Sequence, residues 1–252
     1  MFKLTMWRSA ALSGLIAILV CGLSANAGQI VQGNVTINIT GTAGELMMTD
    51  EVIIPILPGG TFDMKDVPTL GEGMWQGTLG AWGNVDPFTN LAFNVTNIAL
   101  VPVGFTVSVL LPIAPIPGAT LHGGSTGGST TDANNSGTGG LSTLAGIPYY
   151  AGQIDGATVL PIYPDPTSFT FFFAGQTVTI PALNPGLPGP TLPSGPALAS
   201  IGIVHRFLLS PGDTAAGTSF FIVEPIPEPS SIVLAVIGGM GLLLWARRRR
   251  RK

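Results

Sequence analysis

Strict two-residue alternation is the feature that most limits how this chain can fold. In Val35-Thr36-Ile37-Asn38-Ile39-Thr40 every second residue is a β-branched aliphatic one, and the residues between them are polar. This is the pattern of a strand that buries one face. No long stretch of helical periodicity occurs between Gln29 and Glu224. This part of the chain is therefore predicted to consist of β-strands.

Similar short apolar stretches recur along the chain, and clusters of Gly, Pro, Asn and Asp separate them, such as Pro58-Gly59-Gly60. Such clusters favour turns. The predicted strands are residues 35–40, 45–57, 91–100, 105–111, 157–162, 168–173, 176–180, 201–209 and 218–223. Nine or ten short strands without helices between them predict an all-β fold, an antiparallel β-sandwich or jelly-roll-like domain. The run Phe169, Phe171, Phe172 and Phe173 is expected in its core.

Two segments interrupt the predicted all-β domain, which spans residues 28–224. Residues 122–140 are almost entirely Gly, Ser, Thr and Asn, a composition that predicts a flexible exposed loop. Residues 184–196 are rich in Pro and Gly and are expected to form an extended surface connection. Either segment could divide the domain into two subdomains, so one and two subdomains both remain open.

The N-terminal segment has the layout of a secretory signal peptide over residues 1–27. Lys3 and Arg8 precede an apolar core, and Ala25-Asn26-Ala27 provides small residues for cleavage at Ala25 and Ala27. The alternative is an uncleaved N-terminal anchor, but the apolar run is short for a membrane span. Cys21 is the one cysteine of the chain. Cleavage after Ala27 would leave no thiol and hence no disulfide.

The charge of the exported region argues against binding to nucleic acid. Between Gly28 and Glu228 the basic residues are Lys65 and Arg206, against 13 acidic residues, so the net charge is −11. A phosphate-binding surface needs clustered Lys and Arg. Two separated cations cannot form such a surface.

The C-terminal tail, residues 225–252, combines three features in a fixed order. Pro227-Glu228-Pro229 comes first, and the sixteen apolar or small residues 231–246 follow. As a helix these would rise ~24 Å against a hydrocarbon core of ~30 Å, a marginal membrane span. The cations that follow are expected to stay on the cytoplasmic side of the inner membrane; they are Arg247, Arg248, Arg249, Arg250, Arg251 and Lys252. A plain tail anchor is the alternative interpretation.

This order of features resembles the PEP-CTERM sorting domain of Gram-negative bacteria. Ile226 stands where the family usually has Val before Pro-Glu-Pro. The resemblance is confined to the last 28 or so residues. It implies a substrate of exosortase, a multispanning membrane transpeptidase, which would act as a transient partner near residues 227–229. It further implies transfer from the inner membrane to the cell surface or extracellular matrix, typically in species that produce exopolysaccharide.

Catalytic and metal-binding patterns in the exported region are weak. Gly123-Gly124-Ser125-Thr126-Gly127 matches the G-x-S-x-G pattern of a hydrolase, with Asp155 or Asp165 and then His205 following. That mechanism needs a strand-to-helix turn at the serine, and no helix is expected there. His205 is in phase with Ile203 and Phe207, which favours a core position. The acidic pairs Asp63/Asp66 and Asp50/Glu51 lack the spacing of a calcium loop.

The sequence therefore predicts a non-catalytic exported surface or matrix protein with no cofactor and no metal. A carbohydrate-binding or adhesive module on the same fold is the first alternative. Trp75, Trp82, Tyr149 and Tyr150 are its candidate sugar-stacking residues, with exopolysaccharide as the candidate partner. An extracellular hydrolase is the second alternative.

Overall fold

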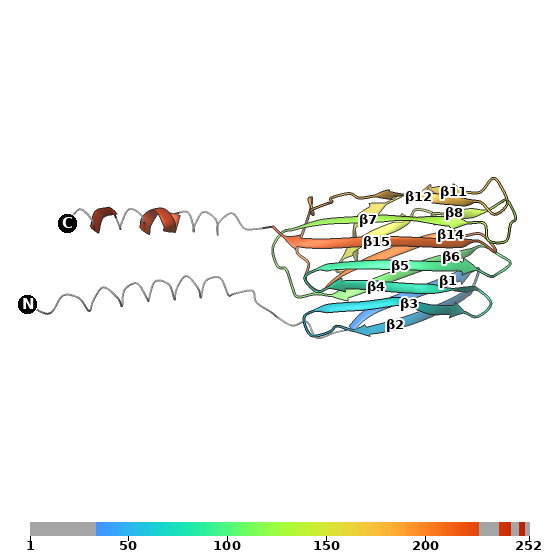
Figure 1. Cartoon of the computed structure of the whole chain (residues 1–252), viewed down its shortest axis with the longest axis horizontal. Coiled ribbons are helices and arrows are strands. Elements are labelled where there is room, and N and C mark those ends of the chain that lie inside the picture. Colours follow the sequence, from blue (N-terminus) through green and yellow to red (C-terminus); the bar gives the residue numbers. More distant parts are fainter. Residues whose placement is uncertain (1–33, 227–236, 243–246, 250–252) are drawn as a thin grey trace, which may run out of the picture.

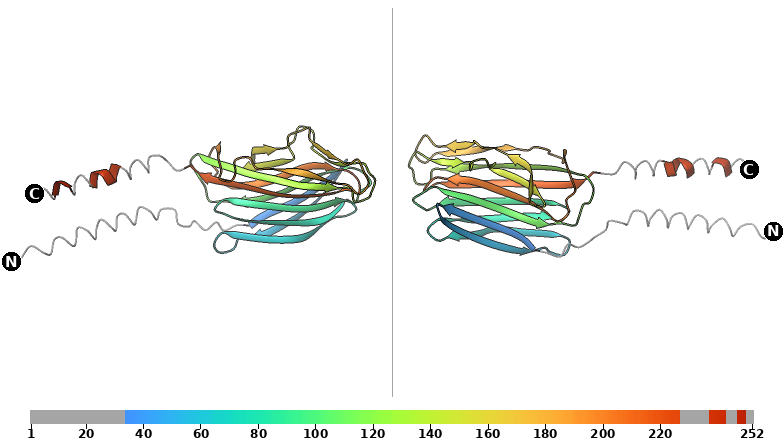
Figure 2. Two further views of the ribbon diagram at one scale, coloured as in Figure 1. Left: turned by 45° about the horizontal axis from the view of Figure 1, so that its top comes forward. Right: turned by 180° about the vertical axis from the view of Figure 1, so that it is seen from behind.

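The chain folds into two antiparallel β-sheets that face each other. The structure, a computed structural model, describes residues 34–226, 237–242 and 247–249. Figures 1 and 2 show the two layers of strands, with the seven-stranded sheet in front in Figure 1. Every strand pair is antiparallel. The prediction of an all-β, sandwich-like fold is thus confirmed.

The eight-stranded sheet, called sheet A, has the main order β10-β9-β14-β6-β1-β2, and β8 joins β11 to β14. Its strands are β1 (Asn34–Ala43), β2 (Leu46–Pro55), β6 (Val103–Pro112), β8 (Gly140–Ser142), β9 (Tyr150–Ile154), β10 (Ala157–Ile162), β11 (Ser168–Thr170) and β14 (Ser200–Leu209).

The seven-stranded sheet, called sheet B, has the order β12-β7-β15-β5-β4-β3, and β13 also pairs with β7. Its strands are β3 (Thr61–Gly71), β4 (Trp75–Asn84), β5 (Phe88–Asn97), β7 (Thr120–Thr131), β12 (Thr177–Leu183), β13 (Leu192–Ser194) and β15 (Thr214–Pro225).

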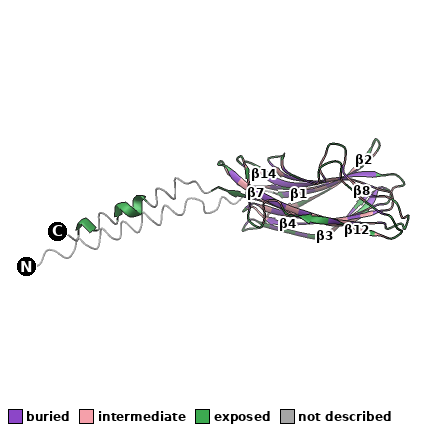
Figure 3. Ribbon diagram, turned by 90° about the horizontal axis from the view of Figure 1, so that it is seen from above, coloured by how far each residue is buried: buried purple, intermediate pink, exposed green. Residues whose placement is uncertain are grey.

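The core lies between the two sheets and is rich in aromatic rings. Every second residue is buried along strands such as β1, β5 and β15 (purple in Figure 3), because one face of each sheet packs against the other sheet. Phe207 of sheet A stacks between Phe93 of sheet B and Phe105, at centroid distances of 5.6 and 5.5 Å. Trp75 meets Phe105 edge-on at 6.0 Å. These rings join the two inner faces into one cluster.

Glycines opposite the largest ring make room for it. A Cβ at Gly41 would lie 2.7 Å from the indole of Trp75, and one at Gly71 would overlap the same indole. Trp75 is fully buried. The indole therefore occupies a slot that exists because β1 and β3 carry no side chain at these two positions.

Several strands escaped the sequence-based prediction. β3 and β4 were missed because a bulge between Met64 and Val67 breaks the alternation in β3, and glycines interrupt β4. The short strands β8, β9 and β13 were also missed. Strands of three to five residues show too little alternation to be recognised from the sequence alone.

The prediction of a flexible loop over residues 122–140 is wrong for its first half. β7 extends through Thr131 and lies between β15 and the pair β12 and β13. Its small residues are needed because neighbouring atoms pack tightly against this strand. A Cβ at Gly124 would lie 2.7 Å from the hydroxyl of Tyr150, and one at Gly128 would overlap the carbonyl of Ala216. The glycines that suggested flexibility are the residues that let this strand fit.

The second half of that segment is a loop held by one carboxylate. Asp132 accepts hydrogen bonds from the N–H groups of Ser136, Gly137 and Gly175 at 2.8–3.0 Å. Burial alone would raise the pKa of Asp132, but these bonds outweigh burial and lower it. The loop is thus tied to the β11–β12 connection.

The prediction that the Phe169–Phe173 run is a core segment is partly wrong. Phe171 is buried and Phe169 packs against the core, but Phe172 and Phe173 are 74% and 72% exposed. Strand β11 ends at Thr170, and the chain turns through residues 171–176. The two-residue periodicity no longer applies after the strand ends.

Residues 184–196 form a surface connection, as expected, apart from the short strand β13 that pairs with β7. Strands from before and after this connection, and before and after residues 122–140, share each sheet.

Phe207→Ala should destabilise the sandwich by ~3–5 kcal/mol, because it removes a ring from the centre of the aromatic cluster and leaves a cavity. The matched control is Phe172→Ala, which removes an exposed ring and should change stability by less than ~0.5 kcal/mol. Chemical denaturation of both variants measures this. Equal losses would contradict the placement of Phe207.

Deleting Ser125 to Gly139 should abolish cooperative unfolding, because the deletion removes most of β7 and the pairing partner of β15 and β12. Circular dichroism during thermal unfolding provides the measurement. A deletion variant that keeps the wild-type midpoint would show instead that the segment is dispensable.

Candidate functional site

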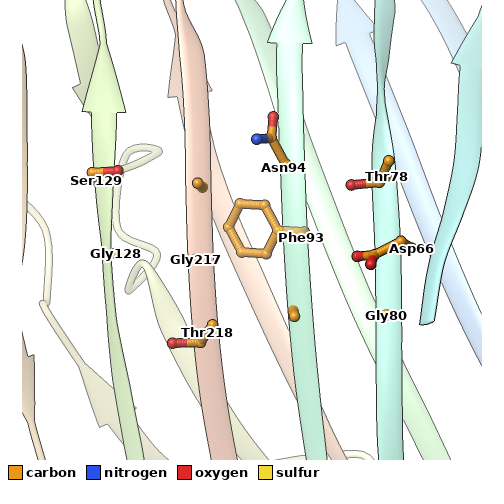
Figure 4. Close-up of a pocket in the computed structure, with 11 residues that line it drawn as sticks. Asp66, Thr78, Gly80, Phe93, Asn94, Gly128, Ser129, Gly217 and Thr218 are labelled. Carbon is orange, nitrogen blue, oxygen red and sulfur yellow. The ribbon is translucent and has the colours of Figure 1, made fainter. Parts of the chain in front are cut away.

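The outer face of sheet B carries a groove that runs across its strands. Gly80 of β4, Ala92 of β5 and Thr218 of β15 lie in one cross-strand row and form its floor. Figure 4 shows this face, with Gly80 and Thr218 on either side of β5. The floor is low because these side chains are absent or short. Two adjoining depressions of about 310 and 470 Å³ share Asp66, Gly80 and Ala92.

The rows on either side of the floor form the walls. On one side Trp82, Asn90 and Phe220 are cross-strand neighbours, and the amide of Asn90 donates to the carbonyl of Trp82 at 3.4 Å. On the other side the corresponding row holds Thr78, Asn94, Ala216 and Ser129. One wall is thus aromatic and the other is polar.

The β3 bulge closes one end of the groove. Lys65 and Asp66 lie opposite Gly80, and Asp66 has a φ of 46°. A Cβ at Gly80 would lie 3.3 Å from the carbonyl of Met64, so the glycine leaves room for the bulge. The ammonium of Lys65 is 3.5 Å from a carboxylate oxygen of Asp63, and both side chains are largely exposed.

Of the four candidate sugar-stacking residues of the carbohydrate-binding alternative, three are core residues. Trp75, Tyr149 and Tyr150 are fully buried, and the hydroxyl of Tyr150 donates to the carbonyl of Phe220 at 2.9 Å. These three rings pack in the core between the sheets and are therefore not available to stack on a sugar. Trp82 is 42% exposed and stands in the groove wall.

His205 occupies the core, as its phase with Ile203 and Phe207 predicted. Its Nε2 lies 2.9 Å from the hydroxyl of Ser219, and the rings of Tyr149 and Phe93 pack at 4.8 and 5.1 Å. Burial lowers the pKa of His205 to about 3. The imidazole is therefore neutral at ordinary pH and joins the two sheets.

The residues of the hydrolase pattern do not come together. Ser125 lies in the middle of β7, paired with Phe220, on the face opposite to the buried Thr126. A nucleophile elbow requires a turn at the end of a strand. His205 is on the inner face of the other sheet. The carboxylate of Asp155 accepts hydrogen bonds from the N–H groups of residues 198–200. The carboxylate of Asp165 accepts them from the hydroxyl of Thr143 and the N–H of Gly146. None of these bonds joins either carboxylate to Ser125 or His205.

The acidic pairs lie on separate strands. Asp50 and Glu51 are on β2, whereas Asp63 and Asp66 are on β3. Among the described residues no group of three or more His, Cys, Asp or Glu is arranged to hold a metal ion. Burial lowers the pKa of His122, the other histidine, on the inner face of β7.

Two buried carboxylates meet where β15 begins, a feature that sequence reasoning missed. Asp213 accepts a hydrogen bond from the N–H of Gly140 at 2.9 Å, and its other oxygen is buried without a partner. Burial and the charge of Asp132 together raise the pKa of Asp213 to about 6. The residues lie far apart in sequence, so no local motif signals this pair.

The tail leaves the sandwich directly after the last strand. β15 ends at Pro225, and the N–H of Ile226 donates to the carbonyl of Ala119 at 3.0 Å. Asn34 lies at the same end, because β1 starts beside the end of β6 and β15 ends beside the start of β7. Both connections to the terminal segments therefore emerge from one end of the sandwich (Figure 1).

Most of the predicted sorting features fall outside the described residues. These are the signal segment 1–27 with Ala25 and Ala27, the motif 227–229, and Arg250, Arg251 and Lys252. Of the predicted membrane helix 231–246, residues 237–242 are described and helical, as are residues 247–249. A search of the described residues finds no helix with the length and apolar character needed to cross a membrane.

Comparison with known proteins identifies the tail. Residues 225–251 match the family model of the PEP-CTERM protein-sorting motif. The resemblance seen in the sequence is thus confirmed, and no curated protein matches the chain.

The PEP-CTERM match begins at Pro225, the last residue of β15. The matched part of the sequence therefore begins where the last strand ends. Such a motif implies recognition by an exosortase and an export route with processing at the membrane.

Asp213→Asn should remove one component of the pH dependence of stability. The folded-state pKa of about 6 lies above the ordinary 3.8, so the native state binds this proton more tightly than the unfolded state. The contribution of Asp213 to stability therefore falls as pH rises from about 4 through 6 and is constant above that range.

Urea unfolding of wild type and Asp213→Asn between pH 4 and pH 8 measures this contribution. The stability of wild type relative to the variant should decline between about pH 4 and pH 6 and then stay level. Parallel profiles would show that Asp213 ionises normally.

Proposed function

We propose that this chain is an exported, non-catalytic protein of the cell surface or extracellular matrix, which an exosortase processes. Residues 1–27 direct export through the inner membrane and are cleaved after Ala27. Residues 231–246 then hold the chain in the membrane, with Arg247 to Lys252 on the cytoplasmic side. The exosortase acts near Pro227-Glu228-Pro229 and releases the β-sandwich to the surface.

The observation that carries the proposal is where the motif lies relative to the fold. The PEP-CTERM match starts at the last residue of β15, and five residues separate Pro225 from Ser231. Five residues span at most ~18 Å when fully extended. Until processing occurs, the tail end of the sandwich is held next to the membrane, and the enzyme must act within that short gap.

The motif also suits recognition by an enzyme. Pro227 and Pro229 each fix φ, remove a backbone donor and disfavour helix at the preceding residue. Glu228 between them adds one charge. An extended peptide with a single carboxylate is a feature that a membrane-embedded site can distinguish from an apolar helix.

The sandwich supports a non-catalytic role. Ser125 sits within a paired strand, and the imidazole of His205 is neutral and hydrogen-bonded inside the core. Neither side chain is placed to activate the other. The groove on sheet B favours a binding role.

Glu228→Ala should block processing, because it removes the charge that the exosortase reads and leaves residues 231–246 unchanged. In an exosortase-bearing host the variant should accumulate at full length in the inner membrane, with less protein at the surface. Mass spectrometry of the C-terminal peptide from membrane and surface fractions measures both.

Replacing Arg247 to Arg250 by Ala is the companion variant. It should weaken retention and orientation in the membrane, whereas Glu228→Ala should not. Wild-type protein at the surface that still carries Arg247–Lys252 would overturn the proposal of processing.

A further inference from the structure

We propose that the groove across sheet B binds an uncharged polysaccharide chain. This inference deepens the proposed surface role by assigning a ligand class to one face of the sandwich. It rests on the described residues of β3, β4, β5, β15 and β7.

The groove has the shape for an extended polymer. Its lining crosses five neighbouring strands, from Asp66 in the β3 bulge through Gly80, Ala92 and Thr218 to Ser129 of β7. Neighbouring strands lie ~4.8 Å apart, so this lining extends roughly 19 Å. That length exceeds a single sugar ring and suits several consecutive rings of one chain.

The wall residues supply the two kinds of contact that sugars need. The indole of Trp82 is partly exposed beside the floor, and Phe88 and Phe220 pack against each other at 6.0 Å in the same area. These rings offer apolar surfaces to the C–H faces of sugars. Asn94, Thr78 and Ser129 on the opposite wall offer an amide and two hydroxyls for hydrogen bonds to sugar hydroxyls.

A peptide is a poorer fit to this groove. The backbone groups of β4, β5 and β15 are engaged in the ladders to their neighbours on both sides. The groove therefore offers no free strand edge for the main-chain pairing that extended peptides use. Recognition must come from side chains, which here are mostly hydroxyl, amide and aromatic.

The charge pattern excludes anionic polymers. Asp63 and Asp66 flank the groove and Lys65 is their one cationic neighbour at this end. The region between Gly28 and Glu228 as a whole carries a net charge of −11. Chains of uronic acids or sulfated sugars would be repelled, and an uncharged chain would not.

The test is affinity electrophoresis of the full-length protein, purified in a polyoxyethylene detergent that has no sugar headgroup. Native gels contain dextran, galactomannan or mixed-linkage β-glucan as uncharged probes and alginate as the anionic probe. We expect retardation by at least one uncharged polysaccharide and none by alginate. Trp82→Ala should weaken the affinity about tenfold or more, as the loss of a central aromatic contact does.

Two matched pairs separate the groove from the rest of the surface. Phe172→Ala removes an exposed ring outside the groove and should bind like wild type. Ala92→Leu fills the floor and should abolish retardation, whereas Gln76→Leu places the same side chain two cross-strand rows away and should not.

Three results would overturn the proposal. They are absence of retardation by all three uncharged probes, equal retardation by alginate, and unchanged binding of both Trp82→Ala and Ala92→Leu. The processing of the tail is measured separately, so neither result decides the other.

Discussion

The packing of large rings against missing side chains is the constraint on which the rest of this structure depends. Trp75 fits because Gly41 and Gly71 are opposite its indole, and the ring of Phe93 fits because Gly217 carries no Cβ, which would lie 2.6 Å away. Interiors tolerate few voids and little overlap, so these bulky residues require glycine on a neighbouring or facing strand. The high glycine content, 35 residues, serves this complementarity within the sheets as well as the turns.

The same rule shapes the outer face of sheet B. Gly80 and Ala92 lower the floor of the groove, and the β3 bulge fits over Gly80. The walls are higher than the floor because the larger side chains of Trp82 and Asn94 occupy the flanking rows. Since adjacent rows on one face are two residues apart along each strand, the groove follows from register. A one-residue slip of β4 against β5 would turn Trp82 into the core.

The positions where the strands begin and end decide which end of the sandwich carries the terminal connections. Asn34 and Pro225 lie at one end, so both terminal connections leave the sandwich there. The groove crosses β15 at Thr218, seven residues before that strand ends, or roughly 23 Å along it. In the proposed route the tail end faces the membrane, and the binding face stands clear of it.

The sequence alone was sufficient to predict the fold class and to recognise the sorting motif of the tail. Local alternation, as in Val35–Thr40, predicts strands without knowledge of their partners, and the tail is recognised because its features are contiguous. Only the tertiary structure decided which aromatic residues are core and which are exposed, and that residues 120–131 form a strand paired on both sides. Trp75 and Trp82 look equivalent in the sequence, but seven residues of β4 place them on opposite faces. The physical reason is that strand pairing brings together residues that are far apart in the sequence. Which side chains are buried, which glycines make room for a ring, and where the groove lies all depend on these pairings.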